Sequence, residues 1–148
     1  MSFILAASAT SPLLASAISW NGGSGSWDDK ANWPPAALPT ASDTAVFGGS
    51  NGTVTATASQ SVLGLQFTAS GYSLAGSALT IGTGGINAAS LSGGTISIAN
   101  PITASSGTQT WNVGTGATLA VGALPAQFGP AGGIVLIKGS ASTTAGNG

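Results

Sequence analysis

Cysteine, histidine, arginine and glutamate are all absent from this chain of 148 residues. The charged residues are Asp28, Asp29, Lys30, Asp43 and Lys138. Tyr72 is the only other ionisable side chain, and a tyrosine titrates near about pH 10, so no side chain has an ordinary pKa near neutrality. General acid–base, thiolate and imidazole chemistry therefore have no obvious candidates, and we expect a protein that is not an enzyme.

The shortage of charge excludes further classes of function. No cluster of lysine or arginine is present to contact phosphates, so nucleic acid is not an expected partner. A serine or threonine nucleophile between Thr44 and Ile137 would have no histidine, lysine or carboxylate beside it in sequence to activate it. The lack of cysteine removes disulfides and thiolate metal sites, and we expect no cofactor.

Long apolar runs are also lacking. No uninterrupted stretch approaches the roughly 20 residues that a membrane-spanning helix needs, so no transmembrane helix is expected. Residues 1–18 contain the short apolar tracts Phe3–Ala7 and Leu13–Ala15, and Ala15–Ala17 fits a small-x-small cleavage site. We interpret residues 1–18 as a signal-peptide-like segment cleaved near Ala17, although no basic residue precedes it; the alternative is an apolar first strand.

The rest of the chain is rich in short runs that alternate apolar and polar residues and contain many β-branched side chains, which is typical of strands. The clearest runs are 53–57, 62–67, 78–81, 95–98, 109–113, 117–121 and 134–137. Glycine, asparagine and proline separate them, as at Asn51-Gly52, Gly84-Gly85 and Asn100-Pro101, where we expect turns. No long helical pattern competes with this interpretation.

Strands recurring at this spacing suit a solenoid, a barrel or a sandwich. The abundance of small side chains favours coils stacked directly above one another, although no single repeat period emerges. The sequence therefore predicts an all-β fold, a right-handed parallel β-helix, with an antiparallel β-sandwich as the alternative.

Residues 19–47 differ in composition from the strands that follow. They contain Trp20, Trp27 and Trp33, four of the five charged residues and three prolines. Because the first coil of a solenoid has an open apolar end, we expect these rings to form a loop-rich N-terminal cap. The predicted division is thus a segment 1–18, a cap 19–47 and solenoid repeats 48–148 that continue beyond the given C-terminus.

One known family has a similar order of residues. The matching segments are Trp20–Gly23, Trp27-Asp28, Ala31–Trp33, Pro39, Asp43–Phe47, Thr53–Thr55, Val62–Phe67, Tyr72–Gly76 and Leu79–Ile81, with looser matches at Ile96–Ile102 and Thr108–Val113. In this order they resemble the opening of bacterial proteins with autotransporter-associated β-strand repeats. Gly132–Gly139 only approximates the glycine-rich repeat that usually follows in that family, so we expect this chain to be a fragment.

The resemblance implies an exported or cell-surface β-helical protein of bacteria, usually without enzymatic activity. We therefore expect a structural or adhesive element, secreted or at the cell surface. Few charged side chains are available to keep other chains off the strand edges, so self-association is expected as well. The alternative function is a filament subunit that completes a neighbour's sheet with the segment around Phe3–Leu5 or with its last strand. The third function considered is that of a carbohydrate-binding module.

The candidate ligand or cap residues all lie in the segment 19–47. Trp20, Trp27 and Trp33 could stack on surface glycans while Asp28, Asn32 and Asp43 bind sugar hydroxyls, but tryptophan is more often buried, so a packing role is favoured. Asp28, Asp29 and Asp43, with Asn21 or Asn32, offer oxygen ligands for calcium. Their spacing matches no known calcium loop, so we assign no metal site and no catalytic residue.

Overall fold

The computed structural model describes residues 15–105, 109–122 and the strand 134–138, and all of its regular structure apart from one short 3₁₀ helix is strand. The strands are β1 (Ala17–Ser19), β2 (Gly25–Ser26), β3 (Thr44–Phe47), β4 (Thr53–Ala56), β5 (Gln60–Phe67), β6 (Ser73–Gly76), β7 (Leu79–Ala88), β8 (Gly94–Ile98), β9 (Ile102–Ala104), β10 (Gln109–Val113), β11 (Ala117–Val121) and β12 (Ile134–Lys138). The helix η1 spans Lys30–Asn32. The expected all-β class is confirmed.

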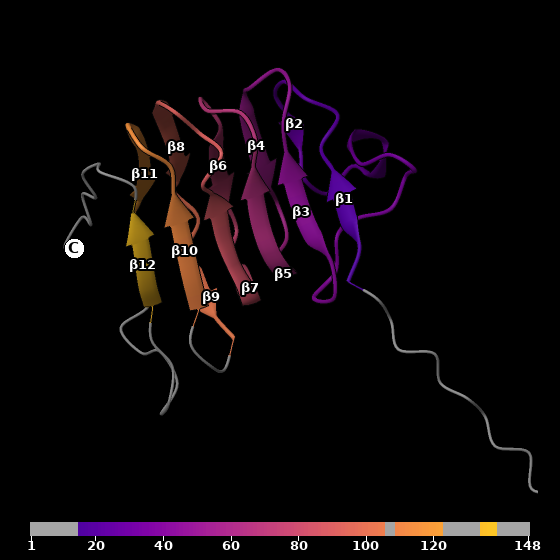
Figure 1. The fold of residues 1–148 in the computed structure, drawn as a ribbon. Helices are drawn as coiled ribbons and strands as arrows, with labels where there is room; N and C mark the ends of the chain where they lie inside the picture. The colour runs from indigo at the N-terminus through magenta and orange to yellow at the C-terminus, as the bar shows by residue number, and fades with distance from the viewer. Residues whose placement is uncertain (1–14, 106–108, 123–133, 139–148) are drawn as a thin grey trace, which may run out of the picture.

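Two parallel sheets face one another across the core (Figure 1). The larger sheet has the order β1-β3-β5-β7-β10-β12, with β9 also paired to β7, and the smaller sheet has the order β11-β8-β6-β4-β2. In Figure 1 the larger sheet points upward at the front and the coils advance from right to left, which is a right-handed winding. The chain is therefore a right-handed β-solenoid. The antiparallel sandwich is wrong, because every pair of neighbouring strands is parallel.

The coils share a register although their lengths differ. Thr44, Gly64 and Gly85 are successive register partners, 20 and 21 positions apart, whereas Ile86 and Trp111 are 25 positions apart. The strands stay aligned because the extra residues lie in the corners between them or in a bulge within β7. This variation explains why the sequence has no single period.

Inward-facing side chains stack in columns along the solenoid. Ala45, Leu65, Ile86 and Trp111 are register partners on successive strands of the larger sheet, and all four are buried. Beside them the rings of Phe47 and Phe67 stack at a centroid distance of 5.1 Å. Burying such apolar area contributes about 25 cal/mol per Å², so these columns favour the folded state.

The strand β7 passes through a segment that the sequence predicts to be a turn. Between the pairs Val62↔Ile81 and Gly64↔Gly85 the register shifts, because β7 uses two more residues than β5. Gly85 lies within the bulged strand with φ 62°, a conformation that glycine adopts without strain. The prediction of a turn at Gly84-Gly85 is wrong, because the bulge absorbs the extra residues without ending the strand.

The first coil is formed by the segment that the sequence predicts to be the cap. β1 and β2 pair with β3 and β4, so each of the two sheets begins before residue 48. Ala17 and Ile18 already belong to β1, so the first strand overlaps the predicted signal-like segment. Residues 1–14, which carry most of that segment, lie outside the described part.

Candidate functional site

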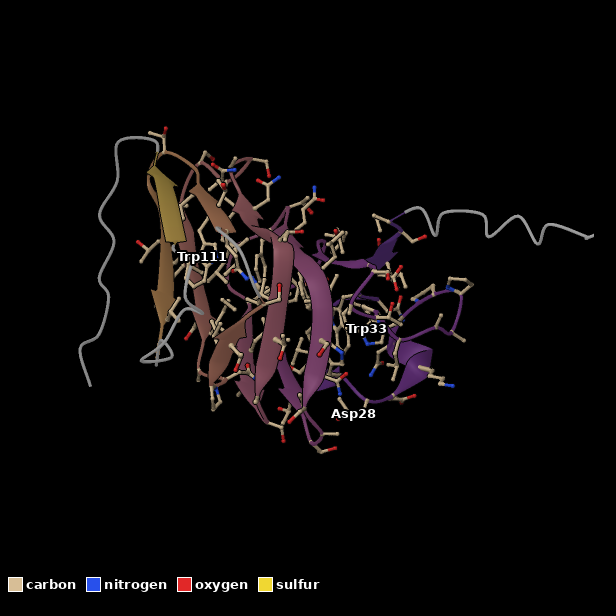
Figure 2. The ribbon with its side chains drawn as sticks, turned by 90° about the horizontal axis from the view of Figure 1, so that it is seen from below. Asp28, Trp33 and Trp111 are labelled. Carbon is tan, nitrogen blue, oxygen red and sulfur yellow. The ribbon has the colours of Figure 1, made fainter. Side chains whose placement is uncertain are left out.

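The three N-terminal tryptophans form one buried cluster. Trp20, Trp27 and Trp33 are 5%, 2% and 0% exposed, and the ring centroid of Trp33 lies 5.0 Å from that of Trp20 and 4.9 Å from that of Trp27. Trp33 also makes an edge contact with Phe47, and Figure 2 shows it at the N-terminal end of the core. These rings close the end of the solenoid. No ring face is left open to stack on a sugar.

Hydrogen bonds fix two of these rings to the backbone. The Trp33 indole N–H donates to the Trp27 carbonyl oxygen at 2.8 Å, and the Trp20 indole N–H donates to the Gly23 carbonyl oxygen at 3.0 Å. Within the described residues the Trp27 indole N–H has no partner although it is buried. Leaving such a donor unpaired costs about 1–3 kcal/mol, which the surrounding aromatic contacts must offset.

Asp28 connects the first coil to the second. Its carboxylate accepts hydrogen bonds from the Thr57 backbone N–H at 2.7 Å, the Thr57 hydroxyl at 2.8 Å and the Gln60 side-chain amide at 2.6 Å. The Thr57 backbone N–H is the main cause that lowers the pKa of Asp28 below its ordinary value, since that bond stabilises the charged form. Asp28, which is labelled in Figure 2, therefore holds the first coil against the second at this corner.

The same corner continues as a ladder through the next coils. The Ser77 hydroxyl donates to the Thr57 carbonyl oxygen at 2.8 Å, and the Asn100 side-chain amide donates to the Ser77 carbonyl oxygen at 2.8 Å. The ladder thus runs from Asp28 through Thr57 and Ser77 to Asn100. Each step satisfies a backbone group at a corner where regular sheet bonding stops.

The other two acidic residues close local turns. Asp29 caps η1 by accepting the Ala31 backbone N–H at 2.9 Å, and Asp43 accepts the backbone N–H and the hydroxyl of Thr40 at 3.0 and 2.5 Å. In the described part of the chain no three acidic, histidine or cysteine side chains gather closely enough to hold a metal ion. Of the aspartates considered for calcium, Asp29 and Asp43 each serve a separate local turn, and Asp28 joins two coils.

Asn32 joins the loop to two other segments of the first coil. Its backbone carbonyl oxygen accepts the Asn21 backbone N–H at 2.8 Å, and its side-chain amide donates to the Ser26 carbonyl oxygen at 2.9 Å. Asn21 lies just beyond the end of β1 and Ser26 lies in β2. One asparagine therefore bridges the segment after β1 and the strand β2. Asn21 itself is exposed.

Two polar residues of the interior were not predicted from the sequence. Gln109 is fully buried, donates its side-chain amide to the Ile81 carbonyl oxygen and accepts the Trp111 indole N–H at 3.1 Å. Tyr72 is buried, its hydroxyl lies 2.7 and 2.8 Å from the carbonyl oxygens of Gly48 and Ser50, and burial raises its pKa. Both side chains satisfy the backbone around them, and among the described contacts neither is hydrogen-bonded to a charged residue.

The fold and the cap define a parallel β-solenoid whose first coil is closed by an aromatic plug. Comparison with protein families, curated proteins and solved structures finds no match to this chain. Across residues 15–105, 109–122 and 134–138, no helix is long and apolar enough to cross a membrane.

Proposed function

We propose that the chain is a non-enzymatic structural or adhesive element of an exported bacterial surface protein. The observation that carries this proposal is the role of the polar groups in the described coils. Each described carboxylate accepts hydrogen bonds that close a turn or join two coils, and the residues of β4 to β11 include no charged side chain. Such a molecule offers a rigid surface and contains little with which to carry out a reaction.

Export and a surface location rest on the resemblance at the sequence level and on the signal-like segment 1–18. A long parallel solenoid suits that location, because stacked coils hold their shape without disulfides or a cofactor. Its outward-facing positions are mainly small or polar and uncharged, as at Thr53, Ser73 and Ser97 in register on the smaller sheet.

Antibodies raised against the folded chain would test this proposal. Applied to intact cells of the organism that encodes the chain, they should label the cell surface or the surrounding medium. Matched labelling of lysed cells controls for antigen that the antibody cannot reach. Labelling that appears only after lysis would contradict export and with it the surface role.

The other two functions receive less support. A filament subunit needs an open edge at its first coil, and the contacts of Asn32 occupy part of that edge. A carbohydrate-binding module needs exposed aromatic faces, and the three cap tryptophans are buried. Both stay predictions, and we favour the structural role.

A further inference from the structure

The first coil has backbone groups that face away from the rest of the solenoid. In a parallel strand, successive residues direct their N–H and C=O groups alternately to the two sides. The N–H groups of Trp20 and Trp27 donate to Val46 and Thr55 of the second coil, so the neighbouring Asn21 and Ser26 face the open side. A further strand would pair with these outward-facing groups.

Asn32 occupies the place where such a strand would lie. Its carbonyl oxygen takes the Asn21 N–H, and its side-chain amide takes the Ser26 carbonyl oxygen, which also accepts the Asp29 N–H at 3.3 Å. The outward-facing N–H group of Asn21, which follows β1, and the carbonyl oxygen of Ser26, in β2, are therefore already paired. Among the described residues, Asn32 leaves the exposed residues Ala17 and Ser19 of β1 uncovered, so it covers the edge of the smaller sheet and the segment after β1.

The segment that provides these contacts is an enlarged corner. In the first coil, residues 28–43 connect Trp27 to Thr44, whereas residues 57–63 connect the equivalent Ala56 and Gly64 of the second coil. Figure 1 shows this loop projecting past β1 at the N-terminal end, and Figure 2 labels Trp33, which belongs to it. The extra length thus covers the end of the coil.

The distribution of charge agrees with this role. Asp29 and Lys30 are exposed on the enlarged corner, while no residue from Thr44 to Ile137 is charged. Natural sheets keep other chains off their edges with short edge strands, covering loops and charged side chains. The first coil has all three, since β1 and β2 contain three and two residues.

We propose that residues 28–43 form a guard that prevents a second copy of this chain from adding its edge strand to the first coil, with Asn32 as the residue that occupies the open side of β2 and of the segment after β1. The partner excluded is another copy, because its parallel strands carry the same uncharged pattern and meet no electrostatic repulsion. The guard is independent of where the protein resides and of the surface role proposed above.

A corner transplant tests the guard. Replacing residues 29–43 with residues 58–63 of the same chain gives the first coil an ordinary corner and retains Asp28. Light scattering coupled to size-exclusion chromatography should give wild-type protein the mass of one chain, and the transplant twice that mass or more, rising with concentration. A folded transplant with the mass of one chain would overturn the proposal, as would wild-type protein that associates under the same conditions.

A second variant decides the matter if circular dichroism shows that the transplant does not fold. Asn32→Ala keeps the loop but removes the donor to Ser26. The matched control is Asn51→Ala, which removes a similar amide contact to the Ser70 carbonyl oxygen, 3.0 Å, away from the first coil's edge. The proposal expects Asn32→Ala to associate at lower concentration than Asn51→Ala, and equal behaviour of the two folded variants would overturn it.

Discussion

At the scale of single residues, the described cap depends on a few side chains that each make several contacts. Trp33 fills the end of the core with its ring and holds the loop through its indole N–H. Asp28 and Asn32 make the polar contacts between that loop and the strands. A single substitution at any of these positions should therefore reduce the stability of the first coil.

Trp33→Ala should lower the free energy of unfolding by about 3–5 kcal/mol, because it leaves a large cavity beside Trp20, Trp27 and Phe47. Urea denaturation followed by circular dichroism measures this loss. Leu38→Ala is the control in the same loop, since Leu38 is only partly buried, and its cost should be clearly smaller. An equal loss in the free energy of unfolding for the two variants would show that Trp33 is not central to the packing of the aromatic cap.

Asp28→Asn should reduce stability at neutral pH by about 1 kcal/mol, because charge-assisted hydrogen bonds to Thr57 and Gln60 are weakened at a largely exposed corner. The pKa of Asp28 lies below its ordinary value of 3.8 in the folded state. Its stabilising effect is therefore complete above that value and is lost as the pH falls through 3.8 toward the folded pKa.

Denaturation at a series of pH values measures this dependence. The wild-type curve should fall more steeply than that of Asp28→Asn as the pH drops below about 5. Asp29→Asn, which alters the adjacent carboxylate with its local turn contact, provides the comparison. If Asp28→Asn had the same pH dependence as the wild type, the hydrogen bonds of the Asp28 carboxylate would not be the source of that dependence.

At the scale of elements, the sequence predicts the strands that alternate strongly and misses those that do not. The runs 109–113 and 117–121 coincide with β10 and β11, because alternation and β-branched residues both favour strands there. β2 has two residues and β6 contains Ser73, Ala75 and Gly76, so neither carries a recognisable pattern. Stacking on neighbouring coils, which no local pattern encodes, makes them strands.

The candidate site was predictable as a location but not in its contacts. The three tryptophans beside charged residues indicate an end cap, because large rings suit an open apolar core end. The bridge made by Asn32 depends on where the loop folds back onto Asn21 and Ser26, and nothing in the spacing reveals that. Likewise Gln109 has an ordinary strand position, and its buried amide depends on hydrogen bonds with Ile81 and Trp111 that the sequence does not reveal.

Close contact between adjacent strands makes some glycines irreplaceable. A Cβ atom at Gly85 would collide with the Thr110 carbonyl oxygen, and the residue has φ 62°. Gly85→Ala should therefore cost at least about 1–2 kcal/mol in the free energy of unfolding. Gly93→Ala is the matched control, since a Cβ atom there meets nothing within 4 Å, and its effect should stay within about 0.5 kcal/mol. Similar losses in the two variants would contradict close strand approach at Gly85.

At the scale of the whole molecule, each coil contacts mainly the coils beside it. Stability in such an array is approximately a sum of coil and interface contributions, so a local defect has a limited range. Hydrogen exchange on Trp33→Ala should show faster exchange in β1, β2 and β3, while β8 and β11 keep wild-type protection. Uniformly faster exchange across all strands would indicate instead that the solenoid unfolds as a single unit.

The register of the strands is independent of the length of the corners. Coils advancing by 20, 21 and 25 residues stack on the same columns of side chains. Insertions at the corners can therefore accumulate over evolution without compensating changes in the interior. Descendants of one ancestral solenoid can present different outer shapes to their surroundings while inheriting an unaltered core.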